Sequence, residues 1–438
     1  MAIAMMTQRS QEDTSMNRPL TVAVAGCGSR GQDTYSKILA GMPEKAKIVA
    51  AADIDPEKLA GMRKLAGIGE SACYASAEDM LKQPKLADIM LICTPDRCHY
   101  AQAKAALLKD YDLLLEKPIS PSAAECAELR DLALQRGRRV AVCHVLRYTA
   151  FYQKIKELLD SGIIGDVVNI QALEQVCYWH QAHSFVRGNW RNKEPSSCMI
   201  LQKCCHDMDI LLWLTGKHCR RVSSFGSLSL FREDKAPAGS GERCLDCAAA
   251  ETCPYNAVKF YLDSFRKSGD AWPQNVVAFA PTEEKILAAL RTGPYGRCAY
   301  RCDNNVVDHQ VVNLELEDGA TVNFTMTAFT AHGGRVIRAG GTMGEIYGDT
   351  KENIIKVMRY GQPDEIIDVR TLTDDFSGHG GGDVRLVREF VDYVRGEIGV
   401  SPTLTSIDRS VESHLVALAA EESRLNGGKV VTTQPTAS

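Results

Sequence analysis

A glycine-rich motif near the start of the chain has the residue types and spacing of a dinucleotide-binding loop. Residues 26–31 read G-C-G-S-R-G, directly after a β-branched run and at the start of a helical segment. Glycines at these positions let the backbone approach a pyrophosphate, which the positive end of the helix attracts. Asp53 ends the next apolar run, where a carboxylate can accept hydrogen bonds from an adenosine ribose. The predicted cofactor contacts here are Gly26, Gly28, Ser29, Arg30, Gly31 and Asp53, and a simple tight turn is the alternative.

Asp53 also indicates which dinucleotide binds. A carboxylate beside the ribose would repel a 2′-phosphate, which favours NAD over NADP, whereas Arg30 nearby could attract that phosphate. The sequence therefore predicts NAD, with NADP as the less favoured cofactor.

Two further residues have side chains suited to proton transfer. Lys117 ends an apolar run as part of Glu-Lys-Pro, and in an open parallel sheet the carboxyl ends of strands face the ligand crevice. It could stabilise a developing alkoxide or act as a base, or belong to a plain surface turn. His206 lies in an apolar helical segment, with Gln202 and Asp209 on its face and Lys203 within one turn. Histidine is the usual proton-transfer residue at neutral pH, although a buried core histidine has the same local sequence.

Residues 178–192 are rich in aromatic and polar side chains. Such a composition is typical of a carbohydrate site, because aromatic faces cover the C–H surfaces of a ring while polar groups bind hydroxyls. A surface loop packed by its own aromatic residues is the alternative. The candidate substrate residues from the sequence are Trp179, His180, His183, Trp190, Arg191, Gln202, Lys203, Asp209, His309 and His379.

Five of the 16 cysteines have the spacing of metal ligands. A C-x2-C pair followed by cysteines from another segment suits tetrahedral Zn²⁺, which would stabilise a region with little core of its own. Cysteine followed by proline also permits an iron–sulfur cluster, and free or buried thiols are the third interpretation. The predicted ligands are Cys244, Cys247, Cys253 and Cys302, with Cys298 as an alternative fourth ligand.

The elements that must position these residues fall into two patterns. Between residues 20 and 145, β-branched runs alternate with helix-length segments, which predicts βαβ units and a parallel sheet buried on both faces. From residue 146 to 438, hairpin-spaced strands with Gly and Asp-Gly turns predict a mostly antiparallel sheet, and two helices near 383–396 and 407–425 close the chain. An irregular cysteine-rich insertion covers about residues 232–304. We expect a disordered tail over residues 1–19.

Length and charge restrict the class of protein. The 438 residues suggest two or three domains, and the net charge of −4 argues against a nucleic-acid or membrane-surface partner. No run reaches the about 18 apolar residues that a membrane span needs. The first residues contain no apolar signal core, so we expect a cytoplasmic protein that binds small molecules.

In order and spacing, these motifs resemble the Gfo/Idh/MocA family, named for glucose–fructose oxidoreductase and inositol dehydrogenase. The resemblance covers nearly the whole chain from Leu20 onward and rests on GCGSRG (26–31), AADID (51–55), CTPDRCH (93–99), LEKP (115–118), SGIIGDV (161–167), NWRN (189–192) and KCCHDMD (203–209). It implies an α/β fold: an N-terminal Rossmann domain with a doubly wound parallel sheet, then an α+β domain with a large open sheet. It also implies NAD(P)-dependent chemistry on sugars, cyclitols or glycosides, and a homodimer or homotetramer formed through the open sheet.

The resemblance also assigns roles to individual residues. The family's catalytic lysine and histidine correspond to Lys117 and His206. Thr94, Pro95, His99 and Glu116 would join the cofactor site, and His144, Arg147 and Tyr148 would lie near the substrate. One position departs from the family pattern D-x-G-x-H-x-x-D, because this chain has Gln202 where the first aspartate stands and Cys204 where the glycine stands. Glutamine can orient the imidazole but cannot take up a proton.

Three functions follow from these residues. The leading hypothesis is an NAD-dependent oxidoreductase that acts on a hydroxyl of a sugar, cyclitol or glycoside, with proton transfer by Lys117 or His206 and hydride transfer to nicotinamide C4. A redox-assisted glycosidase or lyase, which would oxidise C3 transiently and produce no net NADH, is the second. A non-catalytic sugar sensor is the third, although a sensor has no need for both Lys117 and His206.

Overall fold

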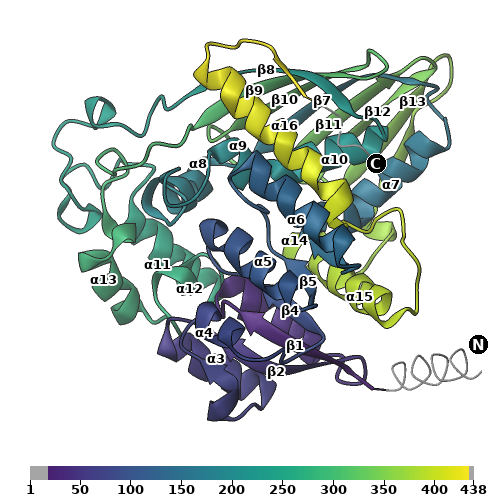
Figure 1. Ribbon diagram of the computed structural model, residues 1–438. Helices are drawn as coiled ribbons and strands as arrows, with labels where there is room; N and C mark the ends of the chain where they lie inside the picture. Colours follow the sequence, from purple (N-terminus) through teal and green to yellow (C-terminus); the bar gives the residue numbers. More distant parts are fainter. Residues whose placement is uncertain (1–17, 434–438) are drawn as a thin grey trace, which may run out of the picture.

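The computed structural model describes residues 18–433, so the predicted tail lies almost entirely outside the described part. At its start, Arg18 forms an ion pair of 2.7 Å with Asp88. The described chain folds around two sheets with helices packed between them (Figure 1). This α/β architecture, with one parallel sheet and one mostly antiparallel sheet, confirms the predicted fold class.

The first sheet has six parallel strands in the order β3-β2-β1-β4-β5-β6. Its strands are β1 (Leu20–Ala25), β2 (Ala46–Ala52), β3 (Cys73–Tyr74), β4 (Ile89–Ile92), β5 (Asp112–Leu115) and β6 (Val140–Val142). The sheet is flanked by the π-helix η1 (Ser29–Ser36) and by α2 (Lys37–Ala40), α3 (Pro56–Ala66), α4 (Ala77–Lys82), α5 (His99–Leu108) and α6 (Ala123–Gln135). The strand order reverses between β1 and β4, which is where open α/β sheets bind their ligands.

The second sheet has nine strands in the order β14-β13-β12-β11-β7-β10-β9-β8-β15. They are β7 (Val167–Gln175), β8 (Cys219–Ser227), β9 (His309–Leu316), β10 (Thr321–Thr327), β11 (Gly334–Gly341), β12 (Gly344–Asp349), β13 (Ile354–Arg359), β14 (Glu365–Asp368) and β15 (Val431–Thr432). Only β7 and β10 pair in parallel among these strands; the other neighbours are antiparallel.

Helices pack between the two sheets and contribute to the apolar clusters of both. The main ones are α7 (Ala150–Asp160), α9 (Met199–Gln202), α10 (Cys205–Thr215), α14 (Ser377–Gly380), α15 (Gly382–Arg395) and α16 (Ile407–Leu425). In Figure 1, α16 runs between the large sheet and α6 of the first domain. The apolar face of α15, including Leu386 and Phe390, packs in the same cluster as β1 residues. The end of the chain therefore returns to the first domain and holds the two sheets against each other.

The segments predicted to be irregular are largely helical. Residues 178–187 form α8 (Tyr178–His180) and the π-helix η5 (Gln181–Arg187). The insertion contains α11 (Ala257–Ser268), α12 (Gln274–Val277) and α13 (Glu283–Thr292), which enclose a small core around Tyr261 and Ile286. The insertion therefore has an apolar core of its own.

Candidate active site

The glycine loop is closely packed at two of its glycines and open at the third. Gly26 has φ of +89°, and a Cβ there would lie 2.5 Å from the carbonyl oxygen of Cys93. A Cβ on Gly31 would lie 1.8 Å from the carbonyl oxygen of Gly26, whereas a Cβ on Gly28 would meet nothing within 4 Å. The loop can therefore form only with glycine at 26 and 31, and it leaves open space at Gly28, beside Ser29 at the start of η1. This arrangement fits the pyrophosphate of a dinucleotide.

Asp53 lies at the end of β2 beside this loop. Its Oδ2 accepts a hydrogen bond of 2.6 Å from the Cys27 amide, and Oδ1 accepts one of 2.8 Å from the Asp55 amide. The carboxylate is thereby fixed next to the loop.

The loops after β4 and β5 are joined through His99. The two ring nitrogens of this buried histidine lie 2.7 Å from the carbonyl oxygens of Thr94 and Pro118. His99 therefore connects the loops that carry Thr94, Pro95 and Lys117, rather than exposing its ring.

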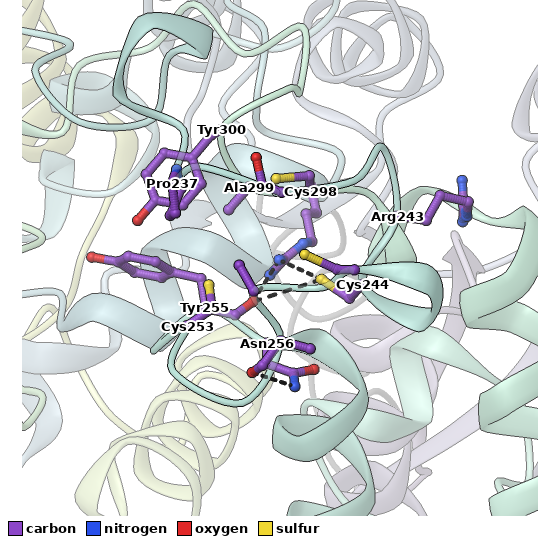
Figure 2. Close-up of a pocket in the computed structure, with 14 residues that line it drawn as sticks. Pro237, Arg243, Cys244, Cys253, Tyr255, Asn256, Cys298, Ala299 and Tyr300 are labelled. Carbon is purple, nitrogen blue, oxygen red and sulfur yellow. Dashed lines mark hydrogen bonds between the residues drawn. The ribbon is translucent and has the colours of Figure 1, made fainter.

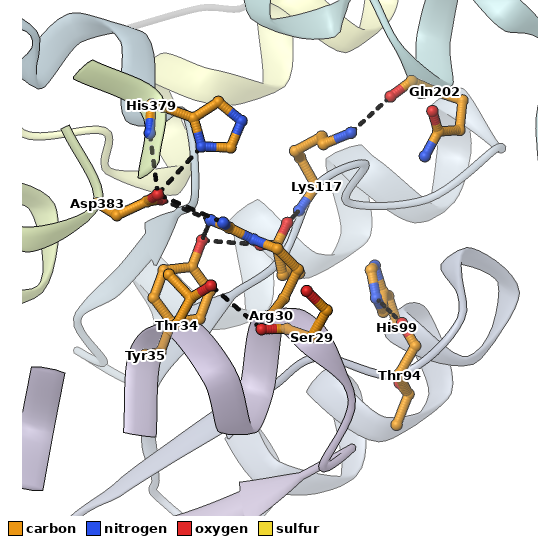
Figure 3. A network of polar contacts seen from close by, with 11 residues as sticks. Ser29, Arg30, Thr34, Tyr35, Thr94, His99, Lys117, Gln202, His379 and Asp383 are labelled. Atoms are coloured by element: carbon orange, nitrogen blue, oxygen red, sulfur yellow. Dashed lines mark hydrogen bonds and ion pairs between the residues drawn. The ribbon is translucent and has the colours of Figure 1, made fainter. Parts of the chain in front are cut away.

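A partly buried ionic network extends from the glycine loop to the C-terminal helices (Figure 3). The Arg30 guanidinium donates to Glu116 at 2.7 Å and to Asp383 at 2.6 Å. His379 lies with Nδ1 3.0 Å from Asp383, and the Tyr35 hydroxyl donates to Glu116 at 2.7 Å. Burial alone would raise the carboxyl pKa values, but the Arg30 charge and the hydrogen bonds hold the pKa of both carboxyls below their ordinary values.

Lys117 meets the second domain at the 202–206 segment. Its Nζ donates a hydrogen bond of 2.7 Å to the backbone carbonyl of Gln202, a contact visible in Figure 3. The Gln202 side chain is not the group that Lys117 contacts, so the change from aspartate to glutamine leaves this contact available.

His206 is buried and lies close to two other histidines. Its ring centroid is 5.6 Å from that of His144 and 6.3 Å from that of His379. Burial, followed by the charge of Lys117, lowers the pKa of His206 well below its ordinary value. Its Nδ1 is enclosed without a hydrogen-bond partner, and both ring nitrogens of His144 are also enclosed and unpaired. His206 is therefore a neutral imidazole.

A second ionic cluster surrounds Lys203. Lys203 lies 3.3 Å from Glu174, and Arg335 pairs with both Glu174 at 2.9 Å and Asp207 at 2.7 Å. Sequence reasoning missed Glu174, Asp207, Arg335 and Asp383. Asp207 and Asp383 are close in sequence to the candidate residues His206 and His379, so they could have been included as site residues. Glu174 and Arg335 come from two strands that meet only in the folded chain.

Several predicted substrate residues have other partners. Arg147 forms two hydrogen bonds of 2.7 Å with Asp209, and both are buried. The hydroxyl oxygen of buried Tyr148 accepts a hydrogen bond of 3.2 Å from the Thr405 backbone amide. Arg147, Asp209 and Tyr148 are therefore engaged by other protein groups.

The remaining predicted substrate residues divide between the insertion and the sheet. His183 is buried with Nδ1 2.7 Å from the Tyr261 hydroxyl. Arg191 pairs with Asp303 at 2.9 Å, exposed Trp190 contacts Phe185, and His309 lies against Asp308 and Phe329. Trp179 and His180 stack on each other at 5.7 Å.

Four of the five predicted cysteine ligands line one small cavity in the insertion (Figure 2). They are Cys244, Cys247, Cys253 and Cys298. Cys302 instead donates its thiol to the Cys298 carbonyl at 3.3 Å, and the Cys244 sulfur accepts a hydrogen bond from Arg187 at 3.6 Å. Within residues 18–433 no group of three or more histidine, cysteine or acidic side chains is arranged to hold a metal ion. The structure therefore does not support the predicted zinc site or an iron–sulfur cluster.

The fold and this site together define a dinucleotide-dependent oxidoreductase. Residues 20–144 match the oxidoreductase family with an NAD-binding Rossmann fold, and residues 156–432 match its C-terminal alpha/beta domain. The chain belongs to the Gfo/Idh/MocA oxidoreductase family. Across residues 18–433, no helix is both long and apolar enough to cross a membrane.

Relatives in the family carry different names. YteT of Bacillus subtilis (strain 168), which is named only as an oxidoreductase, is 22% identical over 84% of this chain and 87% of its own. Inositol 2-dehydrogenase of Pseudomonas fluorescens is 28% identical, and the match covers 44% of this chain and 54% of that protein. The chain therefore matches only about half the length of that dehydrogenase.

Solved structures share the fold at low identity. An inositol dehydrogenase homologue from Azotobacter vinelandii, complexed with NADH and myo-inositol, has a TM-score of 0.66 and 18% identity, covering 96% of this chain and 99% of its own. The WlbA dehydrogenase from Bordetella pertussis, in complex with NADH and UDP-GlcNAcA, has a TM-score of 0.68 and 18% identity, covering 95% and 99%.

Proposed function

We propose that this protein oxidises a hydroxyl of a neutral sugar, cyclitol or glycoside with NAD⁺. The observation that carries the proposal is the hydrogen bond of 2.7 Å between Lys117 Nζ and the Gln202 carbonyl. It joins the end of β5, in the cofactor domain, to the segment that carries His206. A lysine and a neutral histidine from two domains are thus brought to one site, and oxidation of a hydroxyl needs such a pair.

The residues divide the proton chemistry between them. His206 takes the hydroxyl proton at Nε2, because its Nδ1 is enclosed by protein. Lys117 donates a hydrogen bond to the same oxygen and stabilises the charge that develops there. NAD⁺, held by the glycine loop and Asp53, supplies the acceptor for the hydride.

The preference for NAD over NADP is part of this proposal. Arg30 is engaged by Glu116 and Asp383, so its guanidinium is not available to a 2′-phosphate. Asp53 lies beside the loop and would repel that phosphate.

The charged side chains around Lys117 and Lys203 are paired with one another, which favours a neutral substrate. Arg30 and Arg335 are each paired with two carboxylates, and Lys203 shares Glu174 with Arg335. Anionic groups such as a sugar carboxylate would have to displace these pairs. We also propose that the protein is cytoplasmic and that it self-associates through the outer face of the large sheet.

Turnover with a panel of inositols, sugars and glycosides tests this function, with NADH absorbance and leaving-group release followed together. We expect NADH to accumulate, and we expect Lys117→Ala and His206→Ala each to reduce kcat at least about 100-fold with NAD⁺ affinity nearly unchanged. Leaving-group release without net NADH would identify the redox-assisted glycosidase instead. Full activity in both variants would refute the assigned roles.

A further inference from the structure

The insertion brings a tryptophan that the sequence analysis did not single out against the candidate substrate residues. The ring of Trp272 lies 5.4 Å from that of Trp179, 5.0 Å from that of His180 and 5.3 Å from that of His183. These rings come from segments about ninety residues apart. We call Trp179, His180 and Trp272 the aromatic shelf.

The aromatic shelf is supported from below and open above. Phe260 of α11 packs against Trp179 at 5.2 Å, and His183 is buried against Tyr261 and Tyr295. Trp272 nevertheless keeps 40% of its surface exposed. Trp272 meets its neighbours at interplanar angles of 52°, 76° and 87°, so these contacts fix the ring while part of it stays accessible to a ligand.

The aromatic shelf is continuous with the candidate active site. Glu174 at the end of β7 holds Lys203 at 3.3 Å, and the same strand runs on through Cys177 into α8, which carries Trp179 and His180. Cys177 has φ of +66°, a conformation that turns the chain away from the sheet at this point. Burial, followed by the charge of Lys203, lowers the pKa of His180 well below its ordinary value. A ligand on the shelf would therefore extend from the site where Lys117 and His206 act.

The chemistry of the shelf identifies the kind of group that it would hold. Its rings are neutral, since His180 is uncharged, and the nearby Lys203 and Arg335 are paired with Glu174 and Asp207. Such a surface has no excess charge for a phosphate or carboxylate. Aromatic faces do cover the C–H surfaces of a sugar ring well.

We propose that the aromatic shelf is a second binding site, which stacks on the neutral ring linked to the sugar that is oxidised. The substrate would then be a glycoside or disaccharide rather than a free cyclitol. This inference rests on the proposed function for the identity of the first site, but its test measures binding alone.

Calorimetric titration of the NADH-loaded protein, in which the hydroxyl cannot be oxidised, tests the shelf. The probes are glucose, galactose and N-acetylglucosamine, the α- and β-linked homodisaccharides of each, and their phenyl glycosides. We expect at least one disaccharide to bind about tenfold or more tightly than its monosaccharide. In Trp272→Ala the ratio of disaccharide affinity to monosaccharide affinity should fall to near one. In Trp272→Phe, which keeps a ring, most of that ratio should return. Phe279→Ala is the matched control, because Phe279 is an exposed aromatic residue of the same insertion, at 51%, outside the shelf.

The possible outcomes separate the two proposals. An unchanged ratio in Trp272→Ala, or no binding by any probe, overturns the shelf. The proposal is also overturned if phenyl glycosides bind more tightly than the monosaccharides and disaccharides do not, because the shelf would then bind an aromatic group. A disaccharide that binds through the shelf but forms no NADH in the turnover assay with NAD⁺ would support the shelf and refute the proposed oxidation.

Discussion

Four buried histidines should make this protein lose stability in mild acid. His144, His183, His206 and His414 are each at most 7% exposed, and burial lowers the pKa of all four. For His183 and His414 the pKa falls to about 3. In the unfolded chain each returns to a pKa of about 6.5. The stabilisation is therefore complete above about pH 6.5 and is lost as the pH falls below it, because the unfolded chain binds the protons.

The size of the effect follows from the number of groups. At pH 5.5 each histidine favours the unfolded chain by about 1.4 kcal/mol, so four contribute about 6 kcal/mol and unfolding takes up roughly four protons. Burial also raises the pKa of Asp207 and Asp209, which opposes this trend. Each of these carboxylates accepts two arginine hydrogen bonds, which favour its ionised form. The sum of about 6 kcal/mol is accordingly an upper value for these four histidines, and His180 and His379, whose pKa values burial also lowers, act in the same direction.

Equilibrium denaturation in urea between pH 7.5 and 5.5 measures this loss. His414→Gln should make the pH dependence shallower by about one proton, because glutamine stays neutral throughout. His218 is the control: its pKa is raised by Glu412, so its stabilisation is present below about pH 6.5 and lost as the pH rises. His218→Gln should therefore make the acid loss steeper. A free energy of unfolding that changes by less than about 1 kcal/mol over this range would refute the reasoning.

Three further substitutions test the cofactor side of the site. Gly31→Ala should lower Tm and abolish NAD⁺ binding, because its Cβ would clash with the Gly26 carbonyl. Gly28→Ala should weaken NAD⁺ binding and leave Tm unchanged, because its Cβ would meet nothing within 4 Å. Thermal melts and NAD⁺ titrations compare the two variants. Asp53→Ala should reduce the preference for NAD⁺ over NADP⁺, and equal affinities in the wild type would contradict the assignment. Asp383→Asn should cost about 2 kcal/mol of stability by weakening a partly buried, charge-assisted hydrogen bond to Arg30, which denaturation would show as a lower midpoint.

Local signals predicted the first domain well. For α3, Asp55 caps the N-terminus, Pro56 occupies the first turn and Gly67 adopts the left-handed conformation after the last turn, so the bounds of this helix follow from local signals. In contrast, β3 has two residues and carries no periodicity. The two edge strands of the large sheet, β14 and β15, have four and two residues, and strands this short leave little pattern in a sequence.

The candidate site could be predicted only in part, because its members come from both ends of the chain. The motifs around Lys117 and His206 are visible in sequence, but Arg335 lies in a strand whose pattern indicates only a sheet. The cysteine spacing was misleading, since a helical core fills the insertion and Cys302 turns its thiol to a backbone carbonyl.

The glutamine at position 202 helps explain how the site keeps its histidine neutral. A carboxylate beside an imidazole raises the pKa of that imidazole, whereas a nearby cation lowers it. In this chain the position holds an uncharged amide, its backbone carbonyl binds Lys117, and the charge of Lys117 acts on His206 without a carboxylate at that position to oppose it. The histidine is thus ready to accept a proton at physiological pH, but it is a weak base. A weak base can remove a hydroxyl proton only if the developing alkoxide is stabilised as the proton leaves, and Lys117 is placed to provide that stabilisation.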